Sequence, residues 1–196
     1  LGCMESSACN YDAEATQEDG SCDYCSCSNA AGGEGGFGLE LEEVSNDGIY
    51  ITYRVYVTTP GPNDFVSSIS GDASNPSYLR TTTSFYQNVF GGVTPMDISS
   101  GALALVPELA YDSWVTVGLE QAPVAGEGSI GVIPGAWSTD FEAGNSLTVT
   151  DGVGSGWYII PPVASNGLAG DDLKVLVAQL TTDGNITGSL YTQIFP

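Results

Sequence analysis

The sequence contains no histidine. This absence removes the most common general base, the histidine-activated serine and cysteine nucleophiles, and the most common side-chain ligand of transition metals. We therefore expect a protein that is not an enzyme.

Basic residues are almost as scarce. Arg54, Arg80 and Lys174 are the only three, against 24 Asp and Glu residues, and the net charge is −21. Nucleic acids and anionic membranes both select proteins with a cationic face. Three scattered cations cannot form one, so nucleic acids and anionic membrane surfaces are excluded as partners. The sequence also lacks a run of about 18 apolar residues, which predicts no membrane insertion.

Cysteine is absent from most of the chain, because all five cysteines lie within residues 1–27. This segment is also acidic and has no basic residue, so it forms an acidic cysteine-rich module. Residues 28–38 (SNAAGGEGGFG) form a glycine-rich linker, which predicts a flexible connection. Residues 39–196 carry the hydrophobic periodicity. The clustered cysteines and abundant small polar residues favour a secreted protein, extracellular or at the cell surface.

Alternating apolar residues in the third part predict β-strands. The clearest alternations occupy residues 49–57 (IYITYRVYV), 113–119 (SWVTVGL) and 186–194 (ITGSLYTQI). Residues 173–180 (LKVLVAQL) are apolar on both faces, which predicts a central strand covered on both sides. We expect residues 182–185 (TDGN) to form a tight hairpin after that strand.

About nine to eleven strands with regular turn signals favour an all-β fold, namely a single β-sandwich of jelly-roll type over residues 39–196. A closed barrel is the alternative. One short helix is expected near residues 84–90. The N-terminal module is expected to be irregular and bridged by disulfides, since residues 1–27 are too few to form a core.

Residues 2–22 (GCMESSACNYDAEATQEDGSC) resemble a short repeat of large secreted proteins of aquatic Bacteroidota, of the form G-C-T-D-P-x-A-x-N-Y-[ND]-x-x-A-x-x-D-D-G-S-C. The positions that match are Gly2, Cys3, Ala8, Asn10, Tyr11, Asp12, Ala15, Asp19, Gly20, Ser21 and Cys22, and those that depart are Met4, Glu5, Ser6 and Glu18. The rest of the chain resembles a β-rich domain of unknown function that often follows such repeats, in phrases such as GSGWYIIP and DLKVLVAQLTTDGNITGSLYTQIFP. The resemblance implies an exported, surface-associated protein of several modules, and it carries no catalytic residue.

The cysteines of the module allow several bridge patterns. Cys22, Cys25 and Cys27 are too close in sequence to pair easily with one another, so Cys3 and Cys9 should reach forward to them. We favour a Cys3–Cys22 bridge and a bridge from Cys9 to Cys25 or Cys27, which leaves one cysteine for a neighbouring subunit or for a residue outside this sequence. Zinc bound by the CDYCSC segment is the alternative, although an oxidising location disfavours free thiolates.

Oxygen-bearing side chains in the same module form a candidate calcium site. Calcium takes about six to eight oxygen ligands from carboxylates, amides and carbonyls. A bridged loop could bring the candidates together, and these are Asn10, Asp12, Asp19 and Asp23, with Glu18 as the weakest. The alternative is an acidic, solvated loop that holds no ion. No organic cofactor is expected.

Carbohydrate contact depends on which aromatic side chains are exposed. Trp114 and Trp157 lie in apolar strands and are expected in the core, whereas Trp137 follows a turn and is the candidate for stacking on a sugar. Asn185 begins the only Asn-x-Ser/Thr sequon that proline does not block, and it is the candidate for glycan attachment.

These observations predict a structural subunit of an extracellular filament or cell-surface appendage. Its copies would associate with one another through the N-terminal arm, which is the acidic module of residues 1–27, or through added strands, since contacts that do not close produce filaments. The alternative is a carbohydrate-binding, lectin-like module of a secreted protein, with glycans as partners.

Overall fold

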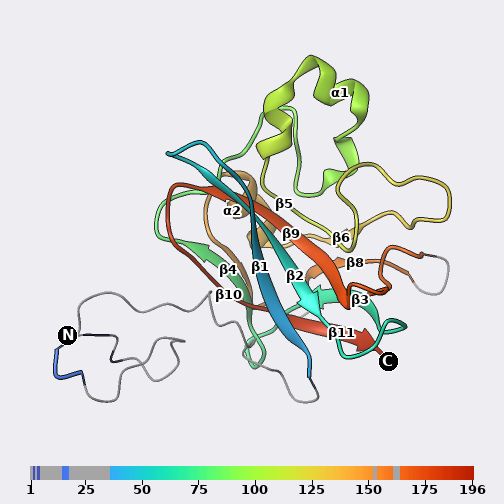
Figure 1. Cartoon of the computed structure of the whole chain (residues 1–196), viewed down its shortest axis with the longest axis horizontal. Coiled ribbons are helices and arrows are strands. Elements are labelled where there is room, and N and C mark those ends of the chain that lie inside the picture. The colour runs from blue at the N-terminus through green and yellow to red at the C-terminus, as the bar shows by residue number, and fades with distance from the viewer. Residues whose placement is uncertain (1, 3, 5–14, 18–35, 152–153, 161–163) are drawn as a thin grey trace.

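The computed structural model describes residues 2, 4, 15–17, 36–151, 154–160 and 164–196. The chain has the expected all-β fold, and its ladders are antiparallel (Figure 1). The strands are β1 (Gly38–Asn46), β2 (Ile51–Thr58), β3 (Phe65–Ser70), β4 (Ser77–Thr81), β5 (Trp114–Val115), β6 (Gly131–Ile133), β7 (Leu147–Val149), β8 (Gly156–Tyr158), β9 (Lys174–Thr182), β10 (Ile186–Ser189) and β11 (Tyr191–Phe195). The helices are short, and they are η1 (Pro95–Asp97), α1 (Ser100–Leu105), η2 (Pro107–Tyr111) and α2 (Ala136–Glu142).

The first sheet has the strand order β1-β2-β9-β5. Strand β9 lies inside it, and every residue of β9 after the first is buried. Val177 and Leu180 belong to the main core, whereas Leu176 packs with Ile98 and Trp114 in a second, smaller core. The prediction of a central strand covered on both sides is therefore confirmed.

The second layer consists of two antiparallel sheets that continue each other end to end. Its two halves have the orders β10-β4-β7 and β11-β3-β8-β6. Only Leu190 separates β10 from β11, and together they pair with β4 and then β3 in one continuing direction. Strands β7 and β8 pair with the other side of β4 and β3 in the same way. Residues 71–76 leave the sheet where the halves meet.

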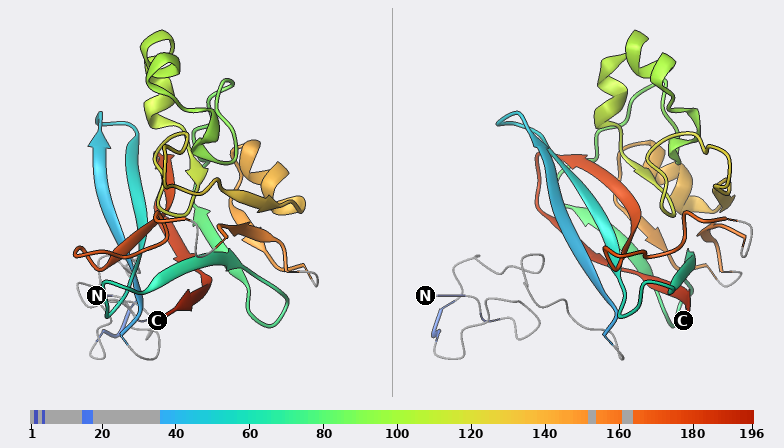
Figure 2. Two further views of the ribbon diagram at one scale, coloured as in Figure 1. Left: turned by 90° about the vertical axis from the view of Figure 1, so that its right-hand side faces the viewer. Right: turned by 45° about the vertical axis from the view of Figure 1, so that its right-hand side comes forward.

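The two layers face each other across the main core, which gives a sandwich-like arrangement (Figure 2). The first sheet contributes side chains such as Val55 and Leu180 to this core. The second layer contributes Val66, Leu147 and Trp157, among others. Burial of these apolar side chains is the main favourable term that holds the layers together.

Ser77 holds the two halves of the second layer together. Its hydroxyl donates a hydrogen bond to the Ser70 carbonyl and accepts one from the Tyr191 N–H at 2.7 Å, and the residue is fully buried. The strands approach closely at this level because residue 71 is glycine. A Cβ on Gly71 would lie 2.3 Å from the carbonyl oxygen of Val149, which is closer than real Cβ atoms come.

Residues 95–111, together with the loop after β5, cover the outer face of the first sheet. Helix α1 and the neighbouring turns project from that face at the top of Figure 1. Ser99 caps α1, because its side chain accepts a hydrogen bond from the Ala102 N–H at 3.1 Å. Leu103 of this helix packs against the second core described above.

The chain between β9 and β10 is a corner and not the hairpin that its TDGN sequence predicts. Strand β9 belongs to the first sheet and β10 pairs with β4 in the second layer. The fully buried Thr182 hydroxyl donates to the Ser84 carbonyl at 2.9 Å and contacts the Thr81 hydroxyl at 2.8 Å. Hydrogen bonds to a neighbouring segment therefore take the place of a ladder across the turn.

Two other expectations need correction. The expected strand over residues 186–194 is divided into β10 and β11, although Ile186, Leu190 and Ile194 do share the core face. No helix forms over residues 84–90, because the Phe85 and Tyr86 N–H groups donate to carbonyls of other segments, at residues 144 and 181.

The burial of the tryptophans agrees with expectation for two of the three. Trp114 and Trp157 are buried as predicted, but Trp137 is only 2% exposed, so its expected exposure is wrong. The reason is that α2 places Trp137 and Phe141 on one helix face, directed into the core. The Trp137 ring lies 5.5 Å from that of Trp157, and its Nε1–H donates to the Ile133 carbonyl at 3.4 Å.

Replacing Ser77 with alanine should destabilise the fold. Ser77→Ala leaves the Ser70 carbonyl and the Tyr191 N–H without the hydroxyl that bonds both of them, which costs about 1–3 kcal/mol of unfolding free energy. Urea denaturation followed by circular dichroism measures this loss. Ser68→Ala, on the adjacent half-buried position of β3, is the matched control and should stay within about 0.5 kcal/mol of the natural chain. Equal effects of the two substitutions would contradict the role given to Ser77.

Candidate functional site

The outer edge of the second layer is a long strand edge without charge. Strands β10 and β11 occupy it in succession, and residues 185–196 include no Lys, Arg, Asp or Glu. Tyr191 and Phe195 are 53% and 46% exposed there. Natural sheets usually protect such edges with charged residues or proline within the strand, so this edge is suited to pairing with another strand.

The backbone direction of β11 shows which groups face outward. The Tyr191 N–H donates to Ser77 and the Gln193 carbonyl accepts from the Ser67 hydroxyl at 3.2 Å, so both residues direct their backbone groups into the sheet. Directions alternate along a strand that has a neighbour on one side. The N–H and carbonyl of Thr192 therefore point away from β3, toward the position that an added strand would take.

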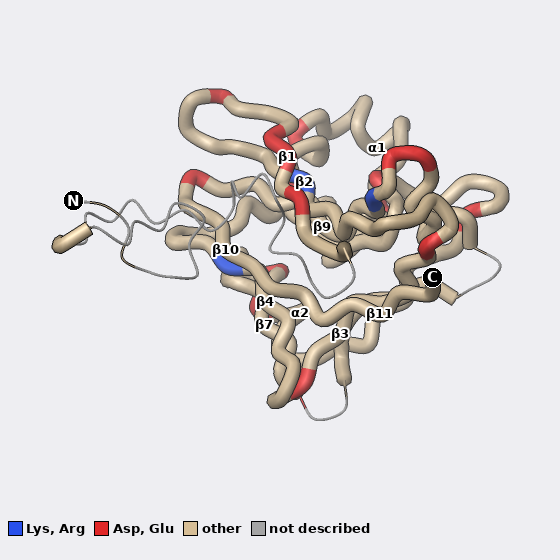
Figure 3. The backbone as a smooth tube through the Cα atoms, turned by 60° about the horizontal axis from the view of Figure 1, so that its bottom comes forward, with Lys and Arg blue, Asp and Glu red and all other residues tan. Residues whose placement is uncertain are grey.

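The corresponding edge of the first sheet differs strongly. Strand β1 carries Glu40, Glu42 and Glu43. The Lys174 ammonium lies 2.5 Å from a Glu40 carboxylate oxygen and 3.7 Å from one of Glu42. Figure 3 shows acidic positions along β1 and none along β11. Charge therefore opposes strand addition at β1 and leaves β11 open to it.

An apolar groove of about 400 Å³ lies beside the uncharged edge, on the outer face of the second layer. Its lining includes Ile133, Ile160, Tyr158 and Phe195, with Ser68 among the polar members. Ile160 is 66% exposed and Ile133 is 45% exposed. The groove adds apolar surface to the hydrogen-bonding groups of the edge.

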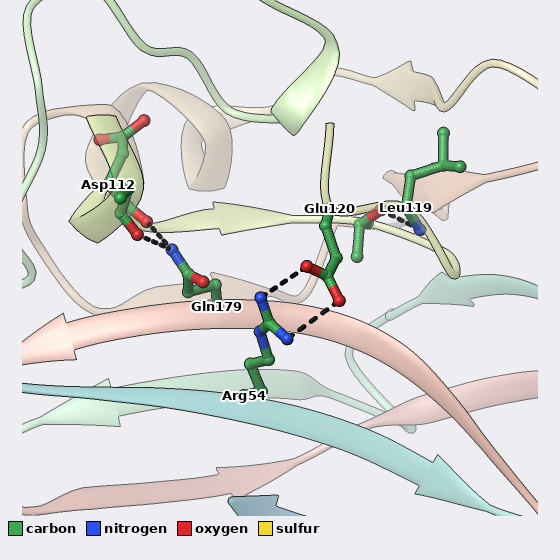
Figure 4. A network of polar contacts seen from close by, with 7 residues as sticks. Arg54, Asp112, Leu119, Glu120 and Gln179 are labelled. Carbon is green, nitrogen blue, oxygen red and sulfur yellow. Dashed lines mark hydrogen bonds and ion pairs between the residues drawn. The ribbon is translucent and has the colours of Figure 1, made fainter. Parts of the chain in front are cut away.

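A second candidate site is a cleft of about 500 Å³ between the first sheet and residues 95–127. Arg54 of β2 donates two hydrogen bonds to the Glu120 carboxylate at its wall, at 2.9 and 2.7 Å (Figure 4). The Nε–H of Arg54 and the Nε1–H of Trp114 are buried without a hydrogen-bond partner among the residues that the structure describes. The cleft therefore has apolar walls and one neutralised ion pair, with the two unpartnered donors buried behind its surface.

Asp112 lies behind this cleft, in surroundings that disfavour the ionised form of its carboxyl group. Burial raises its pKa to about 6, repulsion from Glu142 acts in the same direction, and a 2.7 Å hydrogen bond from the Asn88 N–H opposes both. Its second oxygen makes no hydrogen bond of normal geometry with the described part of the chain. Gln179 of β9 anchors the same segment through the Ala110 and Asp112 carbonyls, at 3.0 and 2.9 Å (Figure 4).

The predicted site residues fall into two groups. The candidate calcium ligands Asn10, Asp12, Glu18, Asp19 and Asp23 and the cysteines Cys3, Cys9, Cys22, Cys25 and Cys27 all lie outside the described residues. Within the described ranges, no cluster of three or more His, Cys, Asp or Glu residues is placed to hold a metal. Asn185 is exposed at the corner before β10, whereas the buried Trp137 offers no face to a sugar.

Comparison with known proteins gives no relative to argue from, since no family model, curated protein or solved structure matches the chain. Among the described residues, no helix is both long enough and apolar enough to cross a membrane.

Sequence reasoning missed two features of these sites. It identified the C-terminal strand but not its place at an edge, because alternation reveals faces and not neighbours. It also passed over Asp112, although an acid immediately before the apolar run SWVTV was a visible signal of burial.

Removing the charge of Asp112 should change how stability depends on pH. The unfolded chain releases this proton near pH ~3.9, whereas the folded chain holds it up to about pH 6, so its contribution to stability is lost as the pH rises through that interval. In Asp112→Asn the side chain keeps its shape and cannot ionise. Its unfolding free energy relative to the natural chain should therefore rise by about 2 kcal/mol between pH ~4 and ~8.

Urea titrations at a series of pH values measure this difference. Asp140→Asn, the same substitution at an exposed position on α2, is the matched control. Parallel pH curves for Asp112→Asn and the natural chain would show that burial does not perturb Asp112.

Proposed function

We propose that this chain is a structural subunit of an extracellular filament or cell-surface appendage, and that copies join through strand addition at the β10–β11 edge. The observation that supports the proposal most directly is the uncharged, exposed edge that ends at the C-terminal strand. The setting outside the cell rests on the cysteine-rich, acidic composition of the chain.

Strand addition fits the chemistry of this edge. An incoming strand would satisfy outward backbone groups such as those of Thr192, and main-chain hydrogen bonds supply affinity without requiring a particular sequence. Tyr191 and Phe195 would supply apolar contacts beside it, together with the adjoining groove. The acidic β1 edge directs the contact to one side of the subunit, because like charges oppose strand addition there.

A contact of this kind uses two different surfaces of the subunit. The edge of one copy would accept an extended segment of the next, and the N-terminal arm that precedes β1 is the proposed donor. Such head-to-tail contacts form filaments when the rotation between copies does not close a ring. The net charge of −21 opposes association, so salt or divalent cations should promote assembly by screening.

A single charge placed on the edge should impair assembly. Tyr191→Lys puts a charged side chain at an exposed position of β11, where an added strand would have to accommodate it. We expect the natural chain to form filaments at ~0.15 M salt with calcium present, and the variant to form at most about one tenth as much assembled material. Sedimentation and negative-stain electron microscopy measure the assembled fraction.

Val44→Lys is the matched control, since Val44 is 40% exposed in β1 and the substitution adds the same charge. It should assemble like the natural chain. Thr192→Pro provides a second test, because proline removes the outward N–H without adding charge. Circular dichroism establishes that each variant is folded. A natural chain that stays monomeric at high concentration, or equal assembly by Tyr191→Lys and Val44→Lys, would overturn the proposal.

A further inference from the structure

Three tyrosines from distant parts of the chain line one pocket of about 300 Å³. Tyr50 immediately precedes β2, Tyr86 follows β4, and Tyr111 ends η2. Tyr50 and Tyr111 are 42% and 45% exposed, and the ring centroids of Tyr50 and Tyr86 are 6.4 Å apart. The pocket is therefore open to solvent and has aromatic walls.

Two carboxylates complete this tyrosine pocket. Asp47 comes from the β1–β2 turn and Glu108 from η2. Glu108 and Tyr111 are three residues apart in a 3₁₀-helix, where side chains at that spacing lie above one another. No Lys or Arg belongs to the lining of the pocket as the structure describes it, so the local charge is negative.

Asp47 is held as a fixed anion. One of its carboxylate oxygens accepts hydrogen bonds from the N–H groups of Tyr50 at 2.7 Å and Ile49 at 2.9 Å. These bonds lower the pKa of Asp47 below its ordinary value. The negative charge therefore persists throughout the neutral range while the second oxygen is left out of these two bonds.

The same chain shows what such a combination of groups can bind. The Lys174 ammonium lies 4.2 Å from the centre of the Tyr56 ring and within reach of two carboxylates, Glu40 and Glu42. Arg80 stands 4.2 Å above the ring of Tyr78. Aromatic faces attract cations because their quadrupole presents negative charge. The tyrosine pocket repeats the set of groups around Lys174, with rings and two carboxylates, but contains no basic side chain of its own.

Three of the six hydroxyl groups that line the pocket, those of Thr52, Tyr86 and Thr181, already have a hydrogen-bond partner. The Thr52 and Thr181 hydroxyls at its floor hydrogen-bond each other at 2.9 Å, and both residues are buried. The Tyr86 hydroxyl accepts from Asn88 at 3.2 Å. A polyol would compete for these groups, whereas an alkylated ammonium requires no hydrogen bond. Calcium is disfavoured as well, because two carboxylates fall far short of its about six to eight oxygen ligands.

We propose that the tyrosine pocket is a binding site for a small organic ammonium ligand, with its cationic head between the rings of Tyr50, Tyr86 and Tyr111 and beside Asp47 and Glu108. The site is separate from the β10–β11 edge, and binding does not depend on assembly. Quaternary ammonium groups fit best, since they combine a positive charge with apolar methyl surface.

Titration with choline tests the proposal directly. Its neutral isostere 3,3-dimethylbutan-1-ol has the same shape without the charge, and methyl glucoside represents the competing saccharide ligand. Isothermal titration calorimetry and chemical shifts of the tyrosine rings report binding. We expect choline to bind at least about tenfold more tightly than the isostere, because only choline gains from the rings and carboxylates.

Variants locate the site. Tyr111→Leu and Glu108→Gln should each weaken choline binding by at least about threefold. The matched controls Phe90→Leu and Asp140→Asn, which make comparable changes at exposed positions outside the pocket lining, should leave it unchanged. Far-ultraviolet circular dichroism confirms that each variant is folded.

Three results would overturn the proposal. Choline and its isostere binding equally would make the pocket merely apolar, and methyl glucoside binding in place of choline would make it a saccharide site. Absence of choline binding, or binding that the pocket variants leave intact, would show that no ammonium site exists there.

Discussion

Strand β9 is buried on both faces, and this constraint shapes the rest of the molecule. In a two-layer sandwich, the outer face of a strand can face water when its side chains are polar. Strand β9 carries Leu176 on that face, so the face has to be covered. Residues 95–111 supply the cover through Ile98 and Leu103, which pack with Leu176 and with Trp114 of the neighbouring strand β5. The cleft beside Arg54 and the tyrosine pocket both lie where this cover meets the first sheet. Both hollows exist because the short helical turns that cover β9 do not contact the sheet along their whole length.

Polar residues on β9 make the cover specific as well as apolar. Gln179 is 3% exposed, yet its amide is satisfied by two carbonyls of the covering segment, at residues 110 and 112. The Thr181 N–H donates a hydrogen bond to the Ser113 hydroxyl at 2.9 Å, which ties β9 to the residue before β5. Buried polar groups are costly when unpaired, so these bonds select one docking position. The raised pKa of Asp112 shows that this docking position carries an electrostatic cost.

The parts of the fold that the sequence predicts are those that depend on faces. The doubly apolar run of β9, the burial of Trp114 and Trp157, and the shared face of Ile186, Leu190 and Ile194 all follow from periodicity. Features that depend on which segments are neighbours do not. The TDGN segment has the composition of a hairpin turn. It differs from a hairpin in the hydrogen bond that the buried Thr182 hydroxyl donates to the carbonyl of another segment. Trp137 follows a turn in sequence, but the turn leads into a helix.

The candidate sites also combine features that the sequence predicts with features that depend on which segments are neighbours. The absence of charge in residues 185–196 is visible in the sequence, whereas the place of that strand at an edge depends on long-range pairing. The tyrosine pocket draws on residues near positions 47, 86 and 108, and no local pattern links them. Only Glu108 and Tyr111 have a spacing that could have suggested a shared face.

The positions of the chain ends have a mechanical consequence. Gly38 of β1 pairs with Thr58, and Phe195 of β11 pairs with Phe65, so both terminal strands meet their partners on either side of the short connection 59–64. The start of β1 and the C-terminus accordingly lie at the same end of the molecule in all three views (Figures 1 and 2). Tension applied between these two points would break the hydrogen bonds of each ladder one after another, starting from this end. The bonds would not share the load, as they do when two strands are pulled along their length. A fibre built from such subunits resists stretching only if the load passes through contacts between copies and bypasses the path along each chain.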